Sequence, residues 1–167
     1  TKTLKIGNSG DYESSFGPVI SQEHRDGILQ TIKSAVKEGA KVACGGKIPE
    51  GVDSKGFYIE PTILINVNNQ MSVAQEEIFG PVLTIQTFRT VDEVIQKANN
   101  SPYGLAAGVW TDKGAKIFNM TSKMRAGVVW ANTYNKFDPS SPFGGYKESG
   151  FGREGGLHGL SAYLNLN

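Results

Sequence analysis

Strand-like and helix-like patterns alternate through the middle of the chain, and this alternation restricts the fold more than any other feature. Apolar, β-prone runs occupy residues 82–88, 105–110 and 128–130, and helical patterns at 91–98 and 115–124 separate them. Strands joined by helices pair in parallel through right-handed crossovers. Continuous apolar runs fit strands that are covered on both faces. We therefore predict an α/β fold with an open, mostly parallel β-α-β sheet and flanking helices.

Capping signals predict where several helices begin. Ser21 and Thr90 each precede a helical pattern, and Glu93 completes a capping box with Thr90. Residues 72–75 have the same spacing, which predicts a short helix that continues through Glu77.

The stretch from residue 133 to residue 156 contains no periodic pattern and is dense in glycine. A loop of this length inside a compact domain is usually functional or unusually packed. Its glycines do not follow a strand and open a helix, as those of phosphate-binding loops do. We instead expect tight loop packing near an active site, with Lys147, Arg153 and Glu154 in a polar network.

Composition argues against several classes of function. Lys and Arg total 17 against 16 Asp and Glu, so no net charge favours nucleic acid or an anionic membrane. No apolar run approaches the roughly 20 residues that span a bilayer. The single cysteine, Cys44, excludes an internal disulfide and favours a reducing compartment, which we expect to be the cytoplasm, with an organellar matrix as the alternative. His24 and His158 lack further ligands at metal spacing, so no metal site is expected.

Three longer motifs occur in a distinctive order. They are EEIFGP at 76–81, NSPYGLAA at 100–107 and PFGGYKESGFGRE at 142–154. In this order and spacing they resemble the C-terminal half of the aldehyde dehydrogenase superfamily, and the resemblance covers nearly the whole chain. It implies that residues 1–167 are the C-terminal portion of the catalytic domain, without the cofactor-binding domain and the catalytic cysteine loop.

The resemblance also implies an activity for the complete protein. In the family, a cysteine thiolate attacks an aldehyde, hydride passes to NAD or NADP, water releases the acid, and a glutamate is the general base. Both residues lie upstream of the matched part, so we expect no catalytic residue here and no activity from this chain alone. Cys44 is not expected to replace the nucleophile, because it lies C-terminal to the position of the family's catalytic cysteine. Its apolar strand favours a packing role. The complete enzyme is expected to be a homo-oligomer.

Three residues are implied to contact the cofactor. Glu77 offers two acceptor oxygens, which suit the vicinal hydroxyls of the ribose beside the nicotinamide. Phe79 would lie against the nicotinamide half of the cofactor, and Leu105 would approach the nicotinamide. The alternatives are a solvated helix residue for Glu77, a core residue for Phe79 and a buried strand leucine for Leu105.

Two further residues are implied to contact the aldehyde. Phe137 and Phe143 flank a short polar loop, and aromatic side chains suit a mostly apolar tunnel. Phe143 could instead anchor the loop. Glu154 is a candidate acid that supports the site from just outside it.

Two other functions compete with the enzyme hypothesis. A non-enzymatic structural or interaction module derived from an aldehyde dehydrogenase would expose strand edges and apolar surface, which invite self-association. An isolated dinucleotide-binding module is the weaker alternative, because the chain lacks the usual Gly-x-Gly-x-x-Gly after a strand.

Overall fold

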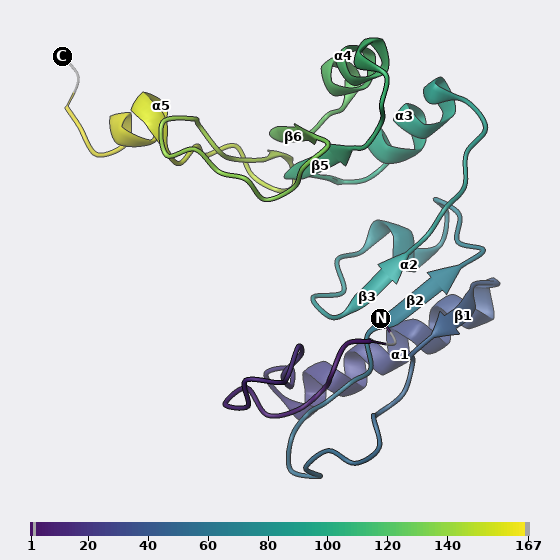
Figure 1. The fold of residues 1–167 in the computed structure, drawn as a ribbon. Coiled ribbons are helices and arrows are strands. Elements are labelled where there is room, and N and C mark those ends of the chain that lie inside the picture. Colours follow the sequence, from purple (N-terminus) through teal and green to yellow (C-terminus); the bar gives the residue numbers. More distant parts are fainter. Residues whose placement is uncertain (2, 166–167) are drawn as a thin grey trace. The chain divides into compact units, whose positions relative to one another are not determined.

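The computed structural model describes residues 1 and 3–165, and the chain divides into two compact units between Thr87 and Phe88 (Figure 1). The first unit contains α1 (Gln22–Glu38), β1 (Lys41–Cys44), β2 (Thr62–Ile65), α2 (Ser72–Gln75) and β3 (Val82–Thr84). The second contains α3 (Val91–Asn99), β4 (Tyr103–Gly104), β5 (Ala106–Val109), α4 (Gly114–Lys123), β6 (Val128–Ala131), β7 (Tyr146–Lys147) and α5 (Gly156–Ser161). The predicted α/β class with open sheets is confirmed. No helix in the described part of the chain is long and apolar enough to cross a membrane.

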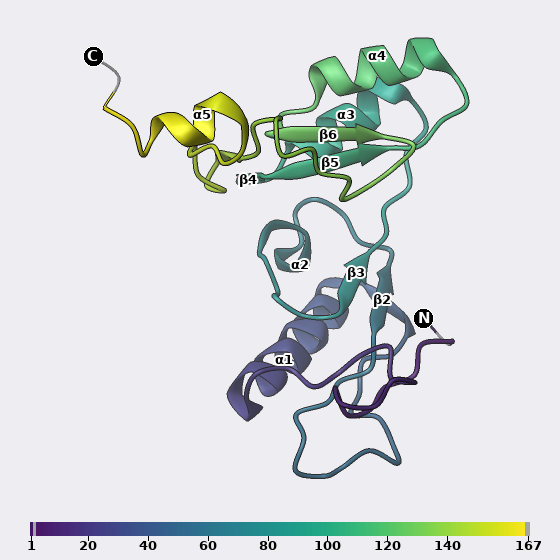
Figure 2. The same ribbon diagram turned by 60° about the vertical axis from the view of Figure 1, so that its left-hand side comes forward.

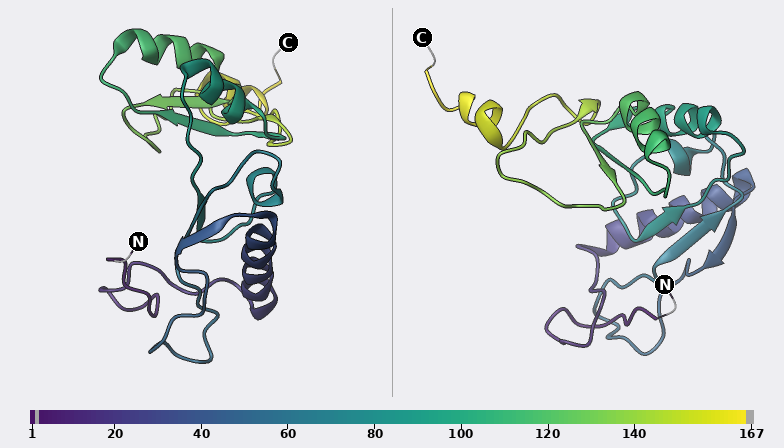
Figure 3. Two further views of the ribbon diagram at one scale, coloured as in Figure 1. Left: turned by 90° about the vertical axis from the view of Figure 1, so that its right-hand side faces the viewer. Right: turned by 45° about the horizontal axis from the view of Figure 1, so that its top comes forward.

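In the first unit, one long helix covers one face of a small sheet. The sheet has the order β1-β2-β3, with β1 antiparallel and β3 parallel to β2. Ile28, Ile32 and Ala35 follow the helical spacing and pack with Leu64 in the core. The N-terminal segment lies on the other side of this sheet (Figure 3, left).

The ends of α1 follow the sequence closely. The hydroxyl of Ser21 accepts a hydrogen bond from the backbone N–H of His24 at 3.1 Å, which confirms the predicted cap. Gly39 ends the helix with a φ of 113°, a left-handed conformation that costs glycine little.

The start of α2 differs from its prediction. Met71 is the residue before the helix, and Ser72 already lies within it. The N–H and the hydroxyl of Ser72 donate to the carboxylate of Glu38, 34 positions earlier. The capping box predicted at 72–75 was therefore wrong, because the acceptor comes from another helix. The helix also ends at Gln75, before Glu77.

In the second unit, β5 and β6 pair in parallel, and α4 joins them and packs on both strands (Figure 2). The predicted β-α-β unit across α4 is thus confirmed. The preceding one, across α3, was wrong, because β3 pairs with β2 instead of β5. An apolar run identifies a strand but does not identify its partner. The short strands β4 and β7 form an antiparallel pair of their own.

The glycine-rich stretch packs as tightly as predicted. A Cβ atom on Gly127 would lie 1.5 Å from the carbonyl oxygen of Gly144 and 3.1 Å from the Cα of Gly145. Only glycine at position 127 lets the loop lie directly against the start of β6.

Candidate functional site

The segment that follows α2 is held to the first unit on both sides of Phe79. Ile78 packs against the core, and a Cβ atom on Gly80 would lie 2.5 Å from the Cδ1 of Ile28. The carbonyl of Pro81 accepts from the N–H of Thr62 at 2.8 Å. These contacts fix the backbone on which Phe79 lies.

Phe79 has an unusual conformation for a bulky residue. Its φ is 56°, and 74% of its surface is exposed. Within the described residues, the ring therefore lies outside the hydrophobic core of the first unit. Left-handed backbone is strained in such a residue and persists where neighbours impose it, often at ligand sites. The neighbours at 78 and 80 impose it here and leave the ring free for a partner.

Glu77 is exposed and lies outside α2. Its carboxylate makes no hydrogen bond or ion pair with any described residue, so both oxygens are available to a ligand. Glu76 is exposed as well, with extended backbone at φ −109° and ψ 141°. Both glutamates are exposed, so exposure does not show which of them binds a ligand. Only their positions in the motif distinguish Glu77 from Glu76.

Leu105 lies between β4 and β5, and its carbonyl accepts from the N–H of Val128 at 3.2 Å. The residue is 44% exposed. Within the described residues, a fixed backbone thus carries a partly exposed apolar side chain at this position.

Phe137 and Phe143 meet edge to face, with ring centroids 5.0 Å apart and planes at 87°. Such pairs are a favoured aromatic geometry. Phe143 also exchanges two backbone hydrogen bonds of 2.7 Å with Glu154, so it anchors the loop as well as joining the pair. The two rings form one aromatic surface, and 59% of Phe137 is exposed.

The loop between the two rings contains its own turn. Asp138 Oδ1 accepts from the hydroxyl of Ser140 at 2.7 Å and from its N–H at 2.8 Å. The hydroxyl contributes most, and together these bonds lower the pKa of Asp138. An ionised Asp138 thus stabilises the turn that connects the rings.

Trp130 was not predicted as part of the site. Its ring packs edge to face on Phe137 with centroids 5.4 Å apart, and its indole N–H donates to the carbonyl of Lys136 at 2.9 Å. The only signal in the sequence is a tryptophan near the end of an apolar run. No local pattern shows which carbonyl an indole will reach.

The predicted network of Lys147, Arg153 and Glu154 was wrong. The ammonium of Lys147 donates to the carbonyls of Asn99 and Ser101 at 2.8 and 2.9 Å. Arg153 donates to loop carbonyls, including that of Gly145 at 2.9 Å. The irregular backbone offers carbonyl acceptors that regular structure does not satisfy. The Glu154 side chain is exposed and has no such bond within the described residues.

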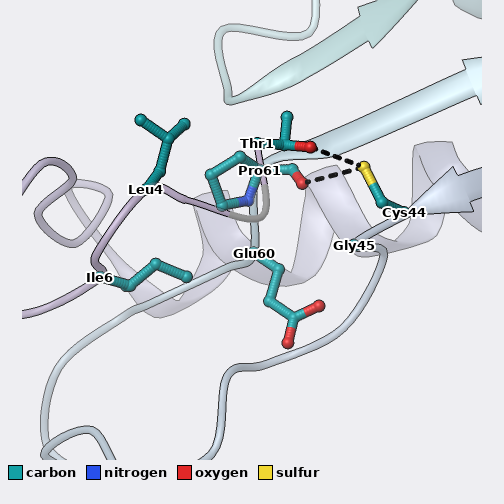
Figure 4. Close-up of a pocket in the computed structure, with 7 residues that line it drawn as sticks. All are labelled: Thr1, Leu4, Ile6, Cys44, Gly45, Glu60 and Pro61. Carbon is teal, nitrogen blue, oxygen red and sulfur yellow. Dashed lines mark hydrogen bonds between the residues drawn. The ribbon is translucent and has the colours of Figure 1, made fainter.

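Cys44 lies beside a small pocket of about 230 Å³ (Figure 4). Its sulfur is 3.1 Å from the hydroxyl oxygen of Thr1 and 4.0 Å from the carbonyl oxygen of Pro61. Ligand pockets are usually roughly 300–1,000 Å³. The half-buried thiol, in β1, fits the packing role expected for it. No group of metal-ligating side chains occurs among the residues that the structure describes.

The candidate residues fall into two groups. Glu77 and Phe79 belong to the first unit, and Leu105, Phe137 and Phe143 belong to the second. The model of the aldehyde dehydrogenase family matches residues 1–167. The chain belongs to the aldehyde dehydrogenase family.

Relatives in this family are similar over almost the whole chain. Human retinal dehydrogenase 2 is 49% identical over 165 residues, and betaine aldehyde dehydrogenase of Bacillus subtilis is 45% identical over 166. Each alignment covers 99% of this chain but only 31% and 34% of those two aldehyde dehydrogenases. The chain thus spans about a third of their length.

Solved aldehyde dehydrogenases share the fold. A betaine aldehyde dehydrogenase double mutant from Staphylococcus aureus, in complex with NAD+, has a TM-score of 0.93 and 44% identity. The Mycobacterium tuberculosis aldehyde dehydrogenase, complexed with NAD+, has a TM-score of 0.92 and 44% identity. These comparisons cover 98% and 97% of this chain, and 33% of each solved chain.

Proposed function

We propose that residues 1–167 form the C-terminal portion of the catalytic domain of an NAD(P)-dependent aldehyde dehydrogenase. The cofactor-binding domain and the catalytic cysteine loop would belong to the rest of that enzyme. Bound NAD or NADP would supply the hydride acceptor that turns an aldehyde into a carboxylic acid. The relatives support this proposal, since two are named for retinal and betaine aldehyde and two solved ones contain NAD+.

The conformation of Phe79 is the single observation that carries the cofactor part of the proposal. The backbone of Phe79 is strained, its neighbours hold it in place, and its ring is exposed. The stability of the fold alone explains this combination poorly. A flat heteroaromatic ring is a suitable partner for its face. Glu77, two residues earlier, would accept from both hydroxyls of the adjacent ribose. Leu105 would add apolar surface beside the nicotinamide.

Phe137 and Phe143 would form part of the wall along which the aldehyde enters. Their paired rings give an apolar surface, and the Asp138 turn and the Glu154 bridge hold the connecting loop. Glu154 would support the site from outside, because its exposed carboxylate makes no hydrogen bond or ion pair with a described residue. A rigid apolar wall with few polar groups is the usual form of a small-molecule site.

The direct test assays the full-length protein that carries this sequence with several aldehydes and NAD or NADP. We expect aldehyde-dependent reduced cofactor from the full-length protein and none from the 167-residue chain, because the proposal assigns the nucleophile and the base to the rest of the enzyme. Turnover by the short chain would contradict the proposal. A folded but inactive full-length protein would favour the non-enzymatic module instead.

We also propose that the complete enzyme is a cytoplasmic homo-oligomer. The helix α5 supports the oligomer, because Leu157 and Leu160 are 74% and 51% exposed and give it an uncovered apolar surface. Light scattering of the full-length protein tests the proposed oligomer, and a molar mass of one subunit would contradict it.

A further inference from the structure

The two rings of the proposed aldehyde wall are held by different means. Phe143 is fixed through its backbone, which exchanges both hydrogen bonds with Glu154. Phe137 has no such ladder among the described residues, and more than half of its surface is exposed. Its orientation therefore depends on side-chain packing and on the residue just before it.

Trp130 supplies both of these restraints. It lies in β6 and is 8% exposed, so its own position is set by the strand and by burial. Its ring meets Phe137 edge to face at 5.4 Å, and its indole N–H donates to the carbonyl of Lys136 at 2.9 Å. Tyr134 packs on the same indole with centroids 4.8 Å apart.

The connection from β6 to Phe137 is also held at its start. Asn132 has a φ of 55°, its side-chain oxygen accepts from the N–H of Thr111 at 2.9 Å, and its amide donates to the carbonyl of Thr111 at 3.0 Å. Between Asn132 and Phe137 the chain spans few residues. Asn132 holds the start of this loop, and the hydrogen bond from Trp130 to the carbonyl of Lys136 holds its end. Together they fix the backbone position of Phe137.

We infer that Trp130 is a positioning residue that orients Phe137 and thereby sets which sizes of aldehyde the enzyme accepts. This inference rests on the proposed function, because it takes Phe137 as part of the aldehyde wall. Trp130 does not itself touch the substrate. It acts through one hydrogen bond and one ring contact, and removing either lets the Phe137 ring swing away from Phe143 and widens the wall.

The test is Trp130→Phe in the full-length enzyme, which removes the N–H and keeps an aromatic ring. We expect kcat to change little, because the reacting groups lie elsewhere. The kcat/KM ratio of a short aliphatic aldehyde to benzaldehyde should fall by roughly tenfold, since pocket contacts of this size give such factors. The matched control is Trp110→Phe. Trp110 stacks on Tyr134, but its indole N–H donates to no described residue, and the ratio of this variant should match that of the wild type.

A double-mutant cycle identifies the route of the effect. If Trp130 acts through Phe137, Trp130→Phe should cause no further change in the ratio once Phe137→Ala is present. Equal losses for both aldehydes, or full additivity with Phe137→Ala, would overturn the inference. If Trp130→Phe does not fold, benzothienylalanine at 130 removes the N–H at nearly constant shape. A wild-type enzyme without aldehyde-dependent activity would instead refute the proposed function, and this inference with it.

Discussion

The carboxylate of Glu38 at the end of α1 accepts hydrogen bonds from both the N–H of Ser72, at 2.8 Å, and its hydroxyl, at 2.6 Å. The residue before α2, Met71, offers no side-chain cap, so Glu38 satisfies the start of this helix from another element. The segment with Glu77 and Phe79 begins where α2 ends. The Glu38 contact therefore supports the part of the first unit that carries Glu77 and Phe79, two of the three proposed cofactor residues.

This contact predicts a pH dependence of stability. The Ser72 hydroxyl, and then its N–H, lower the pKa of Glu38 from the usual 4.5. Because the folded pKa lies below the unfolded one, the contribution is full above the unfolded pKa and is lost as pH falls through the folded pKa. Urea unfolding at a series of acidic pH values should show a shallower loss of stability in Glu38→Gln than in the wild type. The control, Glu50→Gln, alters a side chain that is 93% exposed, and its 3.7 Å ion pair with Lys47 is too exposed to contribute much, so the variant should stay close to the wild-type slope.

Removing the buried hydroxyl of Thr62 should lower the free energy of unfolding. Its oxygen accepts from the N–H of Gly46 and donates to the carbonyl of Glu60, both at 2.8 Å, and the residue is 1% exposed. Thr62→Val keeps the shape but leaves both groups unpaired, so the free energy of unfolding should fall by about 1–3 kcal/mol. Thr3→Val, at an exposed position, should change it by less than about 0.5 kcal/mol. Equal stabilities in denaturant titrations would contradict this reading of the Thr62 bonds.

A side chain at position 127 should clash with the glycine-rich loop. Gly127→Ala would place a Cβ atom 1.5 Å from the carbonyl oxygen of Gly144 and should destabilise the protein by about 3 kcal/mol or more. Gly114→Ala is the matched control, because no atom beyond its chain neighbours and the backbone of its own helix lies within 4 Å of its Cβ position at the start of α4. It should raise stability by about 0.5–1 kcal/mol. Thermal unfolding of both variants separates the loop contact from the general effect of replacing glycine.

Replacing Phe79 should affect stability and cofactor binding in opposite directions. Phe79→Gly relieves the left-handed strain, so the free energy of unfolding should hold or rise by about 1 kcal/mol. The same change removes the ring proposed to face the nicotinamide, so KM for NAD should rise in the full-length enzyme. Phe118→Ala is the control for exposure, since Phe118 is 78% exposed in the other unit. A loss of stability in Phe79→Gly without a change in KM would show that the ring serves the fold.

Local features of the fold could be predicted from the sequence, and long-range pairings could not. Ser21, Gly39 and Thr90 act within a few residues of themselves, and all three cap as expected. The partner of β3 and the acceptor of Ser72 lie far away along the chain, where periodicity carries no information.

The candidate site divides in the same way. The family resemblance indicated Phe137 and Phe143, and the structure brings these two together. The conformation of Phe79 and the bond from Trp130 depend on how neighbouring backbone packs, so no motif could reveal them.

The central claim is that Glu77 binds the ribose of the cofactor, and one paired measurement tests it most directly. The dissociation constant of NAD is measured for full-length Glu77→Gln and Glu76→Gln, whose parent side chains are adjacent and both exposed. Loss of charged hydrogen bonds costs about 1.5–3 kcal/mol, so Glu77→Gln should weaken binding by about tenfold or more. Glu76→Gln should stay close to the wild type. Equal affinities for the two variants, or a larger loss in Glu76→Gln, would contradict the account.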